Sequence, residues 1–154
     1  MHFLHGGIHL RRRDTGATLK RRAADETLLA QFETDWAGDE IPLLVSEGTS
    51  EDKLQSITRS DYLAFCYSRF ARHRGNLVIF GHGIGGQDEH LTHAVNQWDS
   101  QPPNRRQIAI SVRRQIGDEE IRREKARYAR LLPRADLWFY DADSHPLGAP
   151  NVRP

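Results

Sequence analysis

The segment NLVIFG, at positions 76–81, constrains the fold of this chain more than any other stretch. Leu77 to Phe80 are four consecutive apolar residues bounded by an asparagine and a glycine, which predicts a short strand. A strand without alternation of apolar and polar residues is typical of a parallel sheet that is covered on both faces. We therefore expect a parallel sheet with helices packed against it.

The rest of the chain supports this expectation, because strand-like and helix-like segments alternate from Ile41 onward. Residues 3–10 and 17–22 predict an N-terminal β-hairpin around the turn at Asp14–Gly16. Further strands are expected at 41–48, 107–112 and 135–142. Helices are expected at 25–38, twice within 49–75, at 88–98 and at 117–132. The predicted fold class is α/β: a three-layer sandwich, Rossmann-like, with a mainly parallel sheet, in a single domain at 1–148 followed by a loose tail at 149–154.

Charge and composition limit the classes of partner that we expect for this chain. The chain has 154 residues and a net charge of +1, so its overall charge gives no reason to expect nucleic acid or membrane as a partner. The basic run from Arg11 to Arg22 could contact phosphates or form a solvated hairpin, but it has no interleaved aromatic residue for base stacking. The one cysteine, Cys66, fits a reducing cytoplasm. No apolar run is long enough to span a bilayer.

A glycine-rich segment follows the apolar strand. Ligands of open parallel sheets bind outside the carboxyl ends of the strands, and the segment HGIGGQ at 82–87 lies at such an end. Its glycines would let backbone approach a ligand closely. The spacing is not that of a dinucleotide fingerprint, so a nucleotide loop and a glycine-rich turn without a ligand both remain open.

Histidines and acidic residues at predicted strand ends suggest a second chemistry. Asp141, Asp143 and His145 alternate, so an extended chain would present them on one face. With His82 or Asp88 they could ligate a divalent metal, although no compact metal-binding motif is present.

A further motif match has a structural explanation. The segment from Ser50 to Lys53 fits S-x-x-K, the spacing of some serine hydrolases. The motif has no companion, and a helix N-cap by Ser50 explains it better.

Four segments taken together resemble a known family. FLHGGIHL, PLLVSEGTSEDKLQSITRSDYLAFCYSRF, LVIFGHGIGGQDEH and WFYDADSHPLG resemble, in this order, a bacterial domain family of unknown function related to the sirtuin-like NAD-binding superfamily. The resemblance implies that His5 is the catalytic general base toward a ribose hydroxyl of NAD. It also implies a set of cofactor-binding residues: Gly6, Gly81, His82, Gly83 and Asp88. Gly83 stands where sirtuin-like proteins carry a serine.

The resemblance also shapes the expected activity. The chain resembles the C-terminal portion of a sirtuin-like domain, because the glycine-rich turn that cradles the pyrophosphate has no counterpart here. We therefore expect little or no NAD hydrolysis by this chain alone, with a missing N-terminal segment or a second copy as partner. Two alternatives stay open: a nonenzymatic module that binds a nucleotide or a protein, and a metal-dependent hydrolase.

Overall fold

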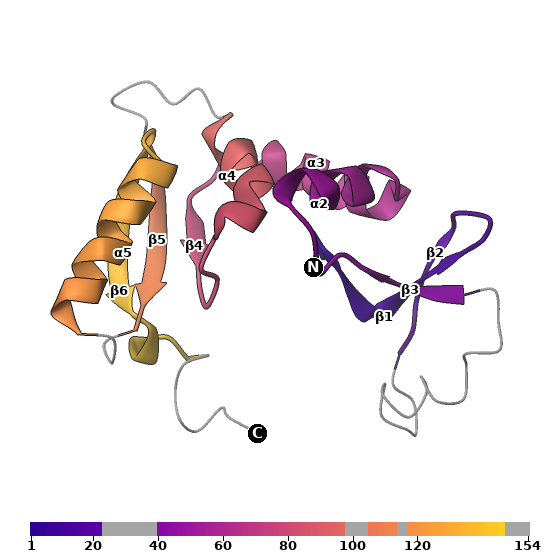
Figure 1. Cartoon of the computed structure of the whole chain (residues 1–154), viewed down its shortest axis with the longest axis horizontal. Helices are drawn as coiled ribbons and strands as arrows, with labels where there is room; N and C mark the ends of the chain where they lie inside the picture. Colours follow the sequence, from indigo (N-terminus) through magenta and orange to yellow (C-terminus); the bar gives the residue numbers. More distant parts are fainter. Residues whose placement is uncertain (23–39, 98–104, 114–116, 147–154) are drawn as a thin grey trace. The chain divides into compact units, whose positions relative to one another are not determined.

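The computed structural model describes residues 1–22, 40–97, 105–113 and 117–146 (Figure 1). The chain divides into two compact units, Met1–Arg72 and His73–Pro154, which are described separately below. The helix predicted at 25–38 and the tail at 149–154 lie outside the described residues. None of the helices in the described ranges combines the length and the apolar character that crossing a bilayer requires. The single domain predicted at 1–148 stays a prediction.

The first unit contains an antiparallel sheet of three strands. Its members are β1 (Gly6–Arg13), β2 (Thr18–Lys20) and β3 (Glu40–Leu44), in the order β2-β1-β3. The hairpin of β1 and β2 confirms the predicted N-terminal hairpin. The predicted strand at 41–48 was expected in the parallel sheet, and this expectation was wrong, because β3 pairs antiparallel with β1. Local sequence gives a strand's position, whereas its partner is fixed by contacts far along the chain.

Two helices complete the first unit, α2 (Ser50–Thr58) and α3 (Asp61–Ala71). They pack on the sheet through a core of four buried apolar side chains: Leu10, Leu43, Ile57 and Leu63. The predicted N-cap of α3 is confirmed, since the Ser60 side chain accepts a hydrogen bond from the Leu63 N–H.

The predicted N-cap of α2 was one residue off. Thr49 is the cap, and its hydroxyl accepts from the Asp52 N–H while the Asp52 carboxylate accepts from the Thr49 N–H. This reciprocal capping box satisfies two amide groups that the helix itself leaves unpaired. The threonine, rather than Ser50, therefore fixes the start of the helix.

Part of the basic run has a structural role. Arg13 and Arg21 both donate to the Glu40 carboxylate at the start of β3, the closer contact being 2.8 Å from Arg21. The hydrogen bond from Arg21, joined by that from Arg13, holds the pKa of Glu40 below its ordinary value. Arg11 is buried, with 3% of its surface exposed. Two of the basic residues thus pair with an acidic residue of the sheet, and a third is buried.

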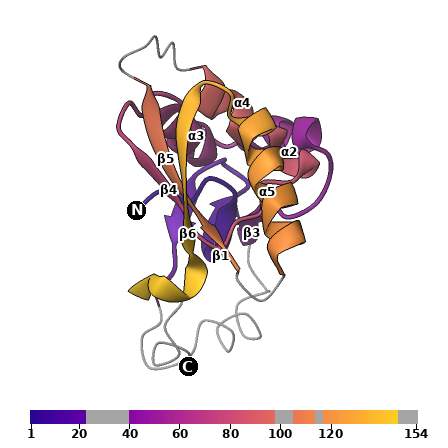
Figure 2. The same ribbon diagram turned by 90° about the vertical axis from the view of Figure 1, so that its left-hand side faces the viewer.

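The second unit contains the parallel sheet. Its strands are β4 (Leu77–Ile79), β5 (Arg106–Val112) and β6 (Ala135–Asp141), in the order β4-β5-β6. The helices α4 (Glu89–Asn96) and α5 (Asp118–Leu131) lie between successive strands in the chain. Figure 2 shows the three strands side by side with α5 running alongside them. The predicted succession of strand and helix is confirmed here, and the fold is mixed α/β.

The helices cover one face of this sheet. Ile108 and Ile110 of β5 are fully buried on that face, and the Tyr128 ring of α5 lies 6.3 Å from the Phe139 ring of β6. Asn96 at the end of α4 donates to the Leu131 carbonyl at the end of α5 (2.8 Å), so both helices lie on this same side.

The opposite face of the sheet carries a row of apolar side chains. Strand register aligns Val78, Ala109 and Trp138 across the three strands. Val78 is 64% exposed and Trp138 is 63% exposed. We call these three residues the open-face row. The second covering layer of a three-layer sandwich therefore stays a prediction.

Candidate functional site

The candidate site lies where the parallel strands end, at their carboxyl edge. β4 is followed by the glycine-rich segment 81–86, here called the glycine loop, whose residues are exposed except for Ile84. The loop leads through a short 3-10 turn (Gly86–Asp88) into α4. The loop is tied to the neighbouring strand, because the Gly81 N–H donates to the Ser111 hydroxyl of β5 (3.1 Å). A loop between a parallel strand and a helix is where α/β folds bind ligands.

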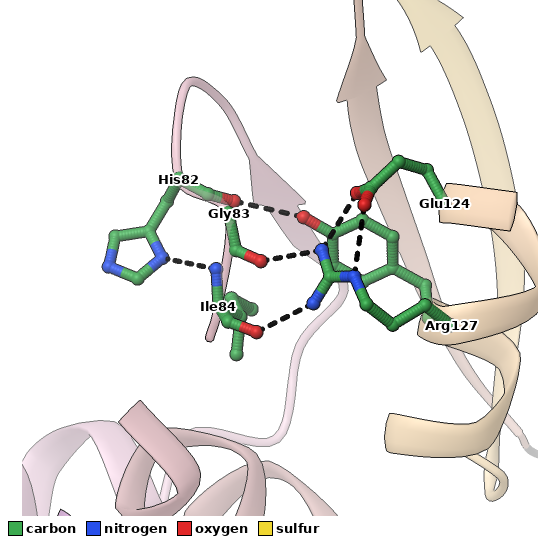
Figure 3. A network of polar contacts seen from close by, with 6 residues as sticks. His82, Gly83, Ile84, Glu124 and Arg127 are labelled. Atoms are coloured by element: carbon green, nitrogen blue, oxygen red, sulfur yellow. Dashed lines mark hydrogen bonds and ion pairs between the residues drawn. The ribbon is translucent and has the colours of Figure 1, made fainter. Parts of the chain in front are cut away.

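The carbonyl groups of the loop are held by two adjacent residues of α5 (Figure 3). The Arg127 guanidinium donates to the carbonyls of Gly83 (2.6 Å) and Ile84 (2.7 Å). The Tyr128 hydroxyl donates to the His82 carbonyl (3.0 Å). Three consecutive carbonyl oxygens thus turn toward α5.

Both donors keep their protons over a wide pH range. The hydrogen bond to Glu124 raises the pKa of Arg127 above its ordinary value. Burial raises the pKa of the Tyr128 hydroxyl. The contacts that hold the glycine loop are therefore insensitive to pH near neutrality.

Ile84 has a strained backbone. Its φ is +38°, in the left-handed region that a β-branched residue rarely adopts. Such a conformation costs about 1–3 kcal/mol and persists only where the surroundings hold it. Here the side chain is buried (7% exposed) and the carbonyl is bound by Arg127. Strain held in this way is found most often at functional sites.

His82 projects from the opposite side of the loop (Figure 3), and both of its ring nitrogens have neighbours. Nδ1 accepts a hydrogen bond from the Ile84 N–H (3.0 Å). In the neutral ring the proton therefore sits on Nε2, which lies 3.8 Å from a carboxylate oxygen of Asp88. In this arrangement the imidazole is a donor facing Asp88, and it offers no free basic nitrogen to a substrate.

The end of β6 is shaped differently from the expected extended strand. Residues 142–144 form a 3-10 turn, capped by the Asp141 carboxylate, which accepts from the Asp143 N–H (3.1 Å). The expected alternation of Asp141, Asp143 and His145 on one face was therefore wrong, because the turn rotates successive residues instead of alternating them.

His145 packs against Phe80, the residue between β4 and the glycine loop. Its ring stacks on Phe80, with 4.5 Å between ring centroids. In the described residues of the second unit, no three ligand atoms from His82, Asp141, Asp143 and His145 converge as a metal site requires. These four residues therefore do not form the metal site that was expected from them.

Two of the predicted site residues lie in the first unit. His5 sits in the turn that precedes β1, and its carbonyl accepts from the Val45 N–H (2.8 Å). The predicted strand at 3–10 begins only at the next residue, Gly6, so His5 precedes it. The role of His5 as a general base stays a prediction.

The other predicted residues come together in the second unit. Gly81, His82 and Gly83 belong to the glycine loop, and Asp88 faces His82 at the start of α4. Comparison with known families matches residues 1–147 to a domain of unknown function, DUF4917. The chain belongs to the DUF4917 family. No curated protein and no solved structure matches it. A family of unknown function was the expected outcome, while a relation of DUF4917 to sirtuin-like proteins stays a prediction.

Sequence reasoning missed four residues of this DUF4917 site: Ser111, Glu124, Arg127 and Tyr128. Ser111 could have been noticed as a polar residue near the end of an apolar strand. The other three lie in a helix with many charged residues, where Arg127 looks like an ordinary solvated side chain. Its contact with Ile84 spans 43 positions, and no local pattern encodes that distance.

Proposed function

We propose that the glycine loop and Asp88 form a binding site for a nucleotide, with NAD as the first candidate. The observation that carries the proposal is the alignment of the loop backbone by α5. A trans peptide points its C=O and N–H in opposite directions, so carbonyls turned toward α5 leave the N–H groups of Gly83 and Gly85 on the other side. Both residues are exposed.

These groups suit the polar atoms of a nucleotide. Exposed amide N–H groups donate to phosphate or hydroxyl oxygens, and the Asp88 carboxylate accepts from a ribose hydroxyl. NAD is favoured over other nucleotides by the resemblance of LVIFGHGIGGQDEH to sirtuin-like sequences. When bound, NAD supplies a glycosidic bond whose cleavage releases nicotinamide.

We expect binding without appreciable hydrolysis by this chain alone. A general base needs an available lone pair within hydrogen-bond reach of the proton that it removes. The Nδ1 lone pair of His82 already accepts from Ile84, and its Nε2 faces Asp88. The glycine loop therefore binds the ligand and does not supply a general base.

Titration calorimetry with NAD and ADP-ribose tests the binding proposal. Asp88→Asn is expected to weaken binding roughly tenfold to a hundredfold, because hydrogen bonds to a charged group contribute about 1.5–3 kcal/mol. The matched control is Asp136→Asn, an exposed aspartate at the other end of the sheet that pairs with Arg105 (3.5 Å). It should bind as the unaltered chain does.

Amide NMR spectra locate the ligand, and an assay of nicotinamide release measures hydrolysis. The signals of Gly81, Gly83, Gly85 and Gly86 should shift on addition of NAD. Absence of binding at millimolar NAD, or shifts that spare these four glycines, would refute the proposal. Nicotinamide release that His5→Ala abolishes would overturn the expectation of an inactive chain.

A second candidate function is self-association through the open-face row. Two exposed large apolar side chains aligned on a sheet face favour burial against another surface. A second copy of the chain presents the same row, so the two rows can pair about a two-fold axis. Sedimentation velocity over a range of concentrations should show association that Trp138→Ser removes. The matched control is Phe65→Ser, on α3 (55% exposed), and a concentration-independent monomer would exclude this function.

A further inference from the structure

Arg127 and Glu124 form a two-part clamp on the glycine loop. The Arg127 side chain donates from Nε and Nη2 to the two Glu124 carboxylate oxygens (3.1 and 2.7 Å). Its Nη1 and Nη2 donate to the Ile84 and Gly83 carbonyls. One guanidinium thus joins a carboxylate on its own helix to two consecutive carbonyls of the loop, as Figure 3 shows. Only arginine, whose planar guanidinium carries five N–H donors, can bind the carboxylate and the two carbonyls at the same time.

The clamp acts on His82 through Ile84. With its carbonyl bound by Arg127, the left-handed Ile84 is held in place, and its N–H donates to His82 Nδ1 (3.0 Å). That bond fixes the imidazole tautomer, which places a proton on Nε2 opposite Asp88. The same carbonyl contacts turn the N–H groups of Gly83 and Gly85 away from α5. A release of the clamp would therefore disturb the loop donors and the His82 tautomer together.

We propose that Arg127 is a positioning residue of the nucleotide site, which sets the ligand-binding form of the glycine loop without touching the ligand. Glu124 orients Arg127, and Tyr128 assists by holding the His82 carbonyl. Contacts within this unit impose the loop conformation. That this conformation serves a nucleotide rests on the proposed function.

The test compares Arg127→Gln and Arg127→Lys with Arg123→Gln in the full chain. Arg123 is the matched control, because it lies one turn earlier on the same helix and pairs with Glu119 and Glu120 instead of with the loop. Lysine keeps the charge but loses the fork. Tyr128→Phe removes a single carbonyl contact and serves as a milder variant.

Two measurements need no ligand. The ¹⁵N shifts of the His82 ring report its tautomer, and hydrogen exchange reports on the Ile84 amide. In Arg127→Gln we expect His82 to become a mixture of tautomers and the Ile84 amide to exchange roughly tenfold faster or more. Arg127→Lys should fall between Arg127→Gln and the unaltered chain, and Arg123→Gln should match the unaltered chain. A merely structural role for Arg127 would lower the melting temperature without moving the His82 tautomer.

Titration with NAD then separates the two proposals. Weaker binding by Arg127→Gln, roughly tenfold or more, supports both of them. Failure of the unaltered chain to bind NAD, with the His82 signals still changed by Arg127→Gln, removes the nucleotide function and leaves the positioning role. Unchanged His82 signals and Ile84 exchange in Arg127→Gln would overturn the inference. If Arg127→Gln does not fold, Arg127→Lys and Tyr128→Phe are judged by the same two readouts.

Discussion

Replacing Gly6 with alanine is expected to destabilise the first unit by about 3–5 kcal/mol. Gly6 has a φ of +78°, and a Cβ at this position would lie 2.0 Å from the Leu43 carbonyl oxygen on β3. The left-handed conformation alone costs alanine about 1–2 kcal/mol. The remainder arises because the backbone of β1 or β3 must move to relieve the overlap. Chemical denaturation followed by circular dichroism measures the loss.

Gly16→Ala is the matched control for this prediction. Gly16 has a similar φ of +83°, but a Cβ there meets no atom within 4 Å. Its loss should therefore be about 1–2 kcal/mol, the cost of the conformation alone. Equal losses in the two variants would show that the close approach of β1 and β3 is absent. The comparison also bears on function. The resemblance implied that Gly6 binds a cofactor, and this role stays a prediction, whereas the close approach of β1 and β3 already explains why the residue is a glycine.

Replacing Ile110 with alanine is expected to destabilise the second unit by about 2–5 kcal/mol. Ile110 is fully buried in the central strand of the parallel sheet. Truncation removes apolar contacts and leaves a cavity that the neighbouring strands and helices fill only in part. The measurement is again the free energy of unfolding from a denaturant titration.

Val78→Ala is the comparison that reports on the other face of the sheet. Val78 is 64% exposed, so the same experiment should show a loss below about 1 kcal/mol, within the range of β-propensity effects. A loss as large as that of Ile110→Ala would mean that a second layer covers this face. The pair of variants therefore decides between a two-layer arrangement and the predicted three-layer sandwich.

The elements of the described chain could largely be predicted from the sequence. The apolar run at Leu77–Phe80, the helical periodicity after Ser60 and the turn at Asp14–Gly16 all gave elements of the expected type. These signals are local, because a strand or helix needs only its own residues to show its period. The start of α2 shows the limit of such signals, since Thr49 and Ser50 are both common cap residues and serine is by type the better of the two. Only the observed hydrogen bonds with Asp52 identify Thr49.

The candidate site could be predicted only in part. The glycine loop was expected because a glycine-rich segment after a parallel strand is a recognisable pattern. Asp88 was implied by the resemblance to sirtuin-like sequences. The tautomer of His82 could not be predicted, because it depends on a hydrogen bond from the backbone N–H of Ile84. The contacts of Arg127 with the loop were also missed, because no local sequence pattern distinguishes this arginine from the others on the same charged helix.

Within the described residues, the sequence by itself predicted the approximate positions of the strands and helices, and it singled out the glycine-rich segment as the one that could approach a ligand. The tertiary structure decided that β3 pairs with β1, that α4 and α5 share one face of the parallel sheet, and that α5 holds the glycine loop. The physical reason is the range of the interactions. Periodicity and turn chemistry act over a few residues, whereas strand partners and the Arg127 contacts join residues that become neighbours only when the chain folds.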